Sequence, residues 1–327
     1  MRVEFQSNTT KVKQLADALR QAIAQGEYKE GEMLPSINKL SAELNLARDT
    51  VFKAFQELKL SGAIQSAPTK GYYVSSSINH VLVMLDIFSP YKNKLYNALT
   101  ENLSPNDRLD LYFHHYNEDH FNMIIKNSLG RYNKYVVMNL LNDVYSEVLN
   151  LLDRSKVLLI DFGKFDKSGY AYVCQGFDTT LYDCLSSGSP LFLKYQKLNF
   201  VFPLNSEHPR GGIRFFHRFC EENNLGSQLI ERHIRKEDIR KGEAFLLVSH
   251  TDMIEAVKIC RAKKLTLGKD VGLVTFNDAP MLEVIGNGIT CISVDFREMG
   301  LLAARFINHN ERLQTYVPTR LIVRGSL

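Results

Sequence analysis

Residues 34–62, LPSINKLSAELNLARDTVFKAFQELKLSG, decide the fold of the N-terminal part of the chain. Ser36 is a good N-cap for one helix, and apolar residues recur at helical spacing from Val51 to Leu58 in the next. An earlier helix with its own apolar stripe precedes them at 12–23. Three short helices with a tight turn between the last two predict a helix-turn-helix.

A short hairpin is expected directly after these helices. Residues 63–65 and 72–74 read as two short strands around the turn Pro-Thr-Lys-Gly at 68–71. A helix-turn-helix followed by such a hairpin predicts a winged helix-turn-helix domain over residues 1–75, with the hairpin as its wing. The serine-rich stretch at 76–80 reads as a linker.

After the linker, apolar strands alternate with amphipathic helices. This pattern is typical of a mainly parallel sheet covered by helices on both faces, which is an α/β fold. Residues 81–327 exceed one comfortable core, so we expect two lobes. The first would take in about 81–172 and 297–314, and the second about 173–296 and 315–327. The clearest strand candidates are 80–87, 109–113, 135–140, 157–161, 199–203, 244–248, 271–276 and 290–294.

The composition sets weaker limits. Of 327 residues, 45% are hydrophobic and 23% are charged, which is the balance of an ordinary globular protein. The net charge of +4 does not by itself indicate a nucleic-acid partner, so any basic patch must be local. The five cysteines contain no CxxC pair, which argues against a disulfide framework and a thiolate zinc site. The N-terminus lacks the apolar segment of a secretory signal, and no apolar run approaches the ~20 residues of a membrane span, so we expect a cytoplasmic protein without a membrane partner.

The ordered motifs of the first 75 residues resemble the GntR family of winged-helix regulators. They run from LPSINKL at 34–40 through LNLARDTV at 44–51 and AFQEL at 54–58 to KGYYV at 70–74. The resemblance implies double-stranded operator DNA as a partner, with the third helix in the major groove and the wing tip at the minor groove or the backbone. The residues that it implies for DNA contact are Ser36, Asn38, Lys39, Arg48, Thr50, Lys53, Lys70 and Gly71.

Some positions depart from the family pattern. The family usually carries an arginine at the position of Asn38, another at that of Phe52 and a glycine at that of Thr69, so the operator sequence cannot be borrowed from relatives. A solvated helix face is the alternative interpretation for Arg48 and Lys53.

Two later segments resemble the sensor fold of LacI/GalR regulators and type 1 periplasmic binding proteins, GLVTFND at 272–278 and ISVDFREMGLLAA at 292–304. The whole chain is similar to the GntR regulators with that sensor, typified by arabinose repressors. In that fold a monosaccharide is held between two hinged lobes, which implies polar groups for its hydroxyls and an aromatic group for its ring. The residues implied for ligand contact are Ser89, Tyr91, Asp161, Arg210, Arg214, His250, Asp252, Asn277 and Phe296.

Alternatives remain open at this site. Arg210 and Arg214 flank the position of the family's ligand arginine, and the sequence does not decide between them; a guanidinium could hold sugar hydroxyls or an acid. Asp161 and Asn277 could instead cap turns, and Phe296 could belong to the core.

The stretch HHYNEDH at 114–120 is the one histidine and carboxylate cluster in the sequence. His114 and His115 would point to opposite sides if the preceding strand continued through them, so we expect a polar loop at a strand end and no metal site. The sequence contains no GxSxG elbow, P-loop or GxGxxG fingerprint, and we therefore expect neither an enzyme nor a cofactor.

Taken together, these observations predict a DNA-binding transcription regulator controlled by a monosaccharide. The resemblance favours a pentose or a 6-deoxyhexose such as arabinose or fucose, and a homodimer is expected because one small head makes too few contacts for a specific site. The sequence leaves open whether the protein represses or activates. The alternatives are a regulator that responds to a small organic acid, and a solute-binding protein or small-molecule enzyme with an unrelated N-terminal module.

Overall fold

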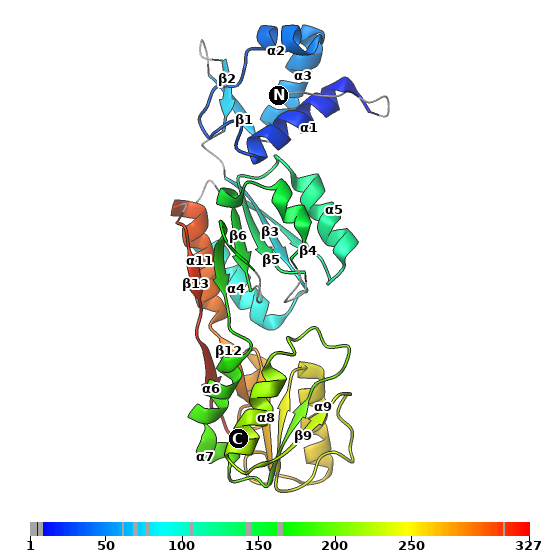
Figure 1. Cartoon of the computed structure of the whole chain (residues 1–327), viewed down its shortest axis with the longest axis vertical. Helices are drawn as coiled ribbons and strands as arrows, with labels where there is room; N and C mark the ends of the chain where they lie inside the picture. The colour runs from blue at the N-terminus through cyan, green and yellow to red at the C-terminus, as the bar shows by residue number, and fades with distance from the viewer. Residues whose placement is uncertain are drawn as a thin grey trace.

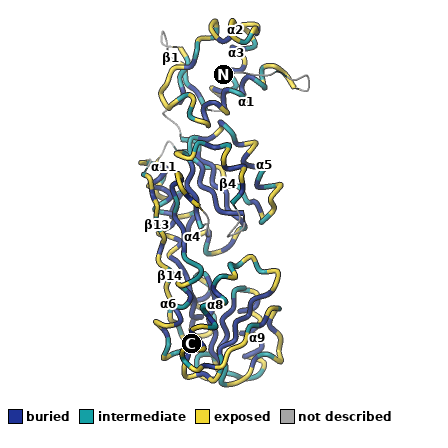
Figure 2. The backbone as a smooth tube through the Cα atoms, viewed as in Figure 1, coloured by how far each residue is buried: buried dark blue, intermediate teal, exposed yellow. Residues whose placement is uncertain are grey.

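The computed structural model describes residues 5, 9–60, 62–67, 71–75, 79–104, 107–140, 145–161, 166–309 and 311–327. The chain forms three units stacked along the long axis of the molecule (Figure 1): an N-terminal helical domain and two lobes, each built on a six-stranded sheet. Figure 2 shows that the central strands of both lobes are buried, whereas the covering helices expose one side. No described helix is long and apolar enough to cross a membrane.

The N-terminal domain is a winged helix-turn-helix. Its three helices precede an antiparallel hairpin in which Ile64 pairs with Val74. The elements are α1 (Lys11–Ala24), α2 (Ile37–Leu44), α3 (Arg48–Leu60), β1 (Ile64–Ala67) and β2 (Gly71–Val74).

Local signals set the turn between α2 and α3. The Ser36 side chain accepts a hydrogen bond from the Lys39 backbone N–H at 3.2 Å, which caps the start of α2. Asn45 ends the helix in the left-handed conformation, at φ 50°, which asparagine adopts more readily than most residues. Both helices then pack on a core that includes the fully buried Leu19 and Phe55. The helix-turn-helix expected from the sequence is therefore confirmed.

The first lobe is built on a parallel sheet with the strand order β13-β7-β6-β5-β3-β4. Side chains alternate between its two faces: Val81 and Val83 join one core, and Leu82 and Met84 join the other. Helices therefore cover both faces. The elements are β3 (His80–Leu85), α4 (Pro90–Glu101), β4 (Arg108–Phe113), α5 (Glu118–Ser128), β5 (Lys134–Met138), the 3-10 helices η1 (Glu147–Leu151) and η2 (Arg154–Lys156), β6 (Val157–Ile160), β7 (Ala171–Cys174), α11 (Phe296–His309) and β13 (Gln314–Tyr316).

The second lobe repeats this plan with the order β14-β12-β11-β10-β8-β9, in which only β14 is antiparallel to its neighbour. Its elements are α6 (Thr179–Ser187), α7 (Ser189–Phe192), β8 (Lys197–Val201), α8 (Gly212–Glu222), β9 (Gly226–Ile230), β10 (Glu243–Leu247), α9 (His250–Ala262), β11 (Val271–Phe276), α10 (Met281–Val284), β12 (Thr290–Val294) and β14 (Thr319–Ile322).

Within the described residues the chain passes between the lobes three times, after β7, after β12 and after β13. Strand β7 runs to Cys174 and β13 to Tyr316, and both lie in the first sheet. The first lobe therefore extends two residues beyond each of the ends at 172 and 314 that were expected from the sequence.

All eight strand candidates are strands: two match the structure at both ends, and the other six have one or both ends shifted by one or two residues. The sequence analysis missed β7, β9, β13 and β14. Strand β9 reads GSQLI and is largely exposed at a sheet edge, and β13 and β14 are also short edge strands. Edge strands of three to five residues bury too little for a local apolar pattern to reveal them.

The N-terminal domain rests on the first lobe through the end of α1. Lys156 Nζ donates to the carbonyl oxygen of Ile23 at 2.7 Å, and a positive charge is favourable at the carboxyl end of a helix. The Asp153 N–H donates to the carbonyl of Ala24 at 3.3 Å. Gly130 approaches α1 so closely that a Cβ atom there would lie 1.6 Å from the carbonyl carbon of Arg20.

Candidate ligand pocket and nucleic-acid interface

A cavity of about 270 Å³ is lined by residues of both lobes. Most of them follow the carboxyl ends of parallel strands, which is where open α/β sheets bind ligands. The first lobe contributes Asp86, Ile87, Tyr91, Lys92, Tyr116, Met138, Asn139, Leu140, Asp161 and Gln175, and the remainder are Phe177, Ser206, Glu207, His208, Pro209, Val248 and Asn277.

The backbone is strained at three positions of this lining. Tyr116, Asp161 and Asn277 have φ values of 56°, 55° and 63°, in the left-handed region that side chains other than glycine rarely adopt. Each such residue costs about 1–3 kcal/mol, and strain of this kind clusters at binding sites, where the surrounding structure holds it. Three strained positions from both lobes around one cavity therefore mark it as a candidate binding site.

Asp86 organises the first-lobe side of the pocket. Its carboxylate accepts hydrogen bonds from the Tyr116 hydroxyl at 2.8 Å and from the Ile87 N–H, and it forms an ion pair with Lys92. Both charged side chains are at least nine-tenths buried. Burial and the neighbouring carboxylate raise the pKa of Tyr116, so its hydroxyl keeps its proton. The sequence analysis missed Asp86, although it directly follows a strand like the predicted Asp161.

Asp161 lies beside this group. Gln175 Nε2 donates to its carboxylate at 2.6 Å, yet burial raises the pKa of Asp161 to about 6. The group is therefore mostly ionised at neutral pH, and its carboxylate can accept hydrogen bonds from a ligand hydroxyl.

Aromatic rings form the wall on the second-lobe side. Phe177 and His208 line the pocket with ring centroids 6.2 Å apart, and His208 packs 4.4 Å from the ring of Phe276. Burial lowers the pKa of His208 to about 4, so its imidazole is neutral near pH 7. The aromatic part of this wall is uncharged and can pack against a small cyclic compound, and Glu207 adds a carboxylate beside it.

Three predicted ligand residues, Tyr91, Asp161 and Asn277, line the pocket together. His250 lies behind them, where its Nε2 is 2.9 Å from the carbonyl oxygen of Phe276 and 3.1 Å from that of Asn277. The ring of Phe296 is 97% buried and packs 5.0 Å from that of Tyr91, so it supports this pocket wall from the core. Ser89 is buried at the start of α4, one turn from the pocket.

The other predicted residues lie elsewhere. Arg210 pairs with Glu231 and Arg214 with Asp178. Both arginines border an adjoining cavity of about 910 Å³, which shares Gln175, Phe177 and Pro209 with the pocket. Asp252 is buried and accepts a hydrogen bond from the Ile234 N–H at 3.0 Å. The structure thus brings neither arginine into the lining of the pocket between the lobes. Arg210 lies in the loop before α8 and Arg214 in its first turn, and both pair with acidic side chains outside that lining.

The stretch at 114–120 contributes Tyr116 to the pocket. Strand β4 ends at Phe113, and His114 is buried with its Nδ1 accepting a hydrogen bond from the Tyr116 N–H. Burial lowers the pKa of His114 to about 4. Within the described part of the chain, no three His, Cys, Asp or Glu side chains converge to hold a metal ion.

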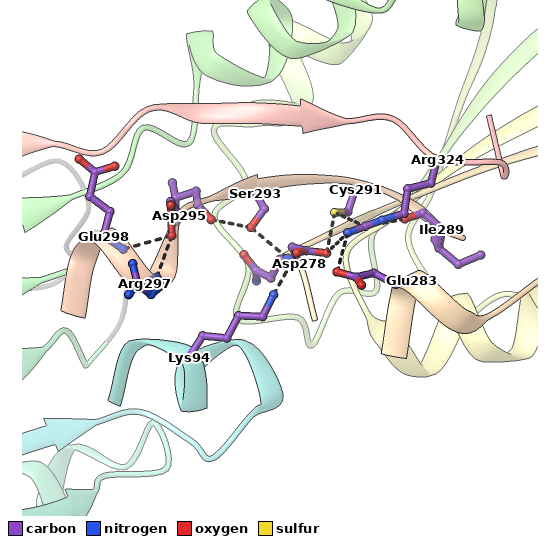
Figure 3. Close-up of polar contacts among 12 residues, drawn as sticks. Lys94, Asp278, Glu283, Ile289, Cys291, Ser293, Asp295, Arg297, Glu298 and Arg324 are labelled. Carbon is purple, nitrogen blue, oxygen red and sulfur yellow. Dashed lines mark hydrogen bonds and ion pairs between the residues drawn. The ribbon is translucent and has the colours of Figure 1, made fainter. Parts of the chain in front are cut away.

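An ion pair connects the two lobes next to the pocket. Figure 3 shows Lys94, from α4 of the first lobe, reaching Asp278, which follows the pocket residue Asn277. The Lys94 Nζ is 3.0 Å and the Arg324 Nη2 is 2.8 Å from the carboxylate of Asp278. Burial favours a raised pKa for Asp278, but the hydrogen bonds and charges of Lys94 and Arg324 lower it. The carboxylate is therefore ionised, and its ion pair with Lys94 connects the second lobe to the first.

The outer face of α2 and α3 carries the predicted DNA contacts. Arg48 is exposed at the start of α3 and forms no ion pair with a described residue, Thr50 is half-buried, and Lys53 pairs with Asp49 at 2.7 Å. Near the start of α2, Ser36, Asn38 and Lys39 are all exposed. At the wing, Gly71 begins β2 at φ 94°, and Lys70 lies outside the described residues.

Comparison with known families agrees with this division. The model of bacterial regulatory proteins of the gntR family matches residues 11–74. The N-terminal domain is a gntR-family domain. The model of the periplasmic binding protein-like domain matches residues 195–327, which cover most of the second lobe, from β8 onward, together with α11 and β13 of the first. The gntR family is one of bacterial regulatory proteins.

The curated relatives match 14–25% of this chain. The uncharacterized HTH-type transcriptional regulator YcxD of Bacillus subtilis is 47% identical over 47 residues, which are 14% of this chain and 11% of that protein. The mannosyl-D-glycerate transport/metabolism system repressor MngR of Escherichia coli is 34% identical over 77 residues, 23% of this chain and 32% of that protein. The chain thus spans about a tenth to a third of the length of these relatives.

Solved structures share the fold of the two lobes. The trehalose repressor from Escherichia coli superposes with a TM-score of 0.62 at 13% identity, over 76% of this chain and all of that one. A LacI family transcriptional regulator from Lactobacillus casei with bound sucrose gives 0.63 at 11% identity, over 76% of this chain and 99% of that one. At these identities the likeness establishes a LacI-type two-lobed fold.

Proposed function

We propose that this protein is a DNA-binding transcription regulator whose interlobe pocket binds a neutral sugar. The observation that carries the proposal is the pocket itself. Three strained backbone positions, the carboxylates of Asp86 and Asp161, and an aromatic wall surround one cavity. Its position beneath a gntR-family domain supports a regulatory role over a transport role.

The chemistry of the lining favours an uncharged ligand. Among the described lining residues Lys92 is the one cation, and it is already paired with Asp86. Asp161 and Glu207 would repel a carboxylate or phosphate. Hydroxyl groups, in contrast, can donate to these carboxylates and accept from the side-chain amides of Asn139, Gln175 and Asn277.

The size of the pocket favours one sugar ring. Its volume of about 270 Å³ lies just below the ~300–1,000 Å³ of pockets for drug-sized ligands. Within this class we propose a pentose or a 6-deoxyhexose, which rests on the resemblance to arabinose repressors. Solved LacI-type relatives hold sucrose or glucose, so the test panel includes these sugars.

We propose a homodimer as the DNA-binding form. A single winged helix presents few contacts, whereas a two-fold dimer reads two half-sites of a palindrome. A ligand changes the affinity for DNA only if it binds one lobe arrangement better than the other, and the coupling is then reciprocal. The two walls of the pocket come from different lobes, so a ligand that contacts both walls favours one arrangement of the lobes.

The experiment is a thermal-shift screen of the full chain against neutral monosaccharides and disaccharides, sugar phosphates and small organic acids. A ligand at 100 times its Kd stabilises the folded state by ~2.7 kcal/mol and raises the Tm. We expect a rise with one neutral sugar that is lost in Asn277→Ala. The matched control is Asn224→Ala, because Asn224 has the same left-handed backbone, at φ 51°, but is exposed away from the pocket.

Binding of DNA is then measured with and without the sugar. A sugar that raises the Tm but leaves the affinity for a selected operator unchanged would contradict the regulatory role. A rise with an acid alone would instead contradict the neutral-sugar assignment and direct attention to Arg210 and Arg214.

A further inference from the structure

One large apolar side chain stands on the outer face of α3. Phe52 is 44% exposed, although the nearby α3 residues Val51 and Phe55 are fully buried. It belongs neither to the core of the N-terminal domain nor to an aromatic pair among the described residues. A single exposed apolar residue needs no explanation in general, so its surroundings decide whether it has a role.

Exposed positive side chains flank Phe52 on α3 and occur on α2, and two of them pair with carboxylates: Lys53 with Asp49 and Lys39 with Glu43. Arg48 precedes it by one helical turn and therefore lies on the same face, and Lys53 follows it directly. Lys39 adds a third exposed positive charge from α2. An apolar ring among these charges fits a polyanion that also offers an apolar group, and fits poorly a purely apolar protein pocket.

The major groove of DNA meets both requirements. Its phosphates would contact the flanking cations, and an α-helix fits its width. Of the four base pairs, only those with thymine present an apolar group there, the C5-methyl, and phenylalanine is one of the side chains that contact it.

We propose that Phe52 reads a thymine C5-methyl group in each operator half-site. The inference rests on the proposed function, because it places α3 in the major groove. It assigns one position of the operator to an A·T pair with thymine on the strand that faces Phe52. The neighbouring Arg48 would contact a base or phosphate within one helical turn of that position.

The test begins by selecting operator sequences from random double-stranded DNA with the full-length protein. We expect one thymine per half-site that becomes unspecified when the selection is repeated with Phe52→Ala. Replacing that thymine by 2′-deoxyuridine removes only the methyl group, and should weaken binding of the natural protein about fourfold per half-site, the effect of burying one such group. Phe52→Ala should bind the two DNAs equally.

Two controls separate this effect from a general loss. Deoxyuridine at other thymines of the operator should change the affinity of the natural protein less. Met123→Ala, which removes a side chain of similar exposure from α5 in the first lobe, should keep the full preference for thymine. Because Phe52 is largely outside the core, the Tm of Phe52→Ala should match that of the natural protein.

The outcomes are distinguishable. If DNA is selected but deoxyuridine has no effect at any half-site position that depends on Phe52, the inference is wrong while the proposed function stands. If Phe52→Ala instead changes the oligomeric mass, the side chain belongs to a protein interface. If the full chain selects no DNA sequence, the proposed function fails and the inference fails with it.

Discussion

The ion pair between Lys94 and Asp278 should stabilise the lobe arrangement that holds ligand. It joins α4 of the first lobe to the loop after β11 of the second, one residue beyond the pocket residue Asn277. If the lobes separate when the pocket empties, the pair breaks. Replacing Lys94 by methionine removes the charge while keeping much of the side-chain volume, so it should weaken ligand binding without altering the pocket.

The magnitude follows from the exposure of the pair. The two groups are 3.0 Å apart, with side-chain exposures of 33% for Lys94 and 16% for Asp278. Exposed pairs contribute ~0.2–1 kcal/mol, and the enclosure of Asp278 places this one near ~1 kcal/mol. That amount corresponds to an increase in the ligand Kd of about fivefold, provided that the ligand binds only the arrangement in which the pair is formed.

The assay is titration calorimetry with the sugar found in the thermal-shift screen, on Lys94→Met, Asp278→Asn and the double variant. A double-mutant cycle is needed because Asp278 also pairs with Arg324. Lys258→Met is the matched control, since its partner Glu255 lies on the same helix of the same lobe. Equal Kd values for Lys94→Met and the natural protein at low salt, or a coupling energy of zero in the cycle, would refute the reasoning.

Three further predictions concern other parts of the chain. Arg48→Ala should lower the affinity for the selected operator at least tenfold, from the ~1–3 kcal/mol of a good base contact, and leave the ligand Kd unchanged; an unaltered operator affinity in a gel-shift titration removes Arg48 from the interface. Asp161 has a pKa raised to about 6, so the folded state holds its proton more tightly than the unfolded state and this group's contribution to stability falls as the pH rises from about 4 through 6. Asp161→Asn should therefore raise the Tm relative to the natural protein more at pH 7 than at pH 4, and a difference independent of pH would contradict this. Gly130→Ala places a Cβ atom 1.6 Å from the backbone of Arg20 and should separate the N-terminal domain from the first lobe, which small-angle X-ray scattering detects as a larger maximum dimension; Gly31→Ala, also at positive φ but with nothing within 4 Å, is the control that should keep the natural dimension.

The pocket shows where prediction from the sequence ended. Tyr91, Asp161 and Asn277 were predicted from the resemblance to LacI-type sensors, and the structure places them on one cavity. Asp86 and Lys92 were missed as a pair, because a lysine six residues after an aspartate reads as an ordinary surface charge. Only the turn into α4 brings the two together and makes them part of the lining.

The arginines illustrate the opposite case. Arg210 and Arg214 lie close to the position at which related sensors carry a ligand arginine, and their chemistry suits a sugar or an acid. The loop before α8 directs Arg210 toward Glu231, and the first turn of α8 directs Arg214 toward Asp178. The direction of a side chain at a helix start depends on how the helix packs on its sheet, and residue type alone does not fix it.

The sequence by itself determined the elements whose signals are local. These elements are the helix cap at Ser36, the apolar stripes of the first three helices and the eight apolar strands. Each depends on residues that are close in the sequence, and each was predicted. The tertiary structure alone decided which strand ends meet across the two lobes, which charges pair there, and that Phe52 stays outside the core. These features depend on residues far apart in the chain, such as Lys94 and Asp278, and their contact is set by packing of whole elements, which no local pattern of residues encodes.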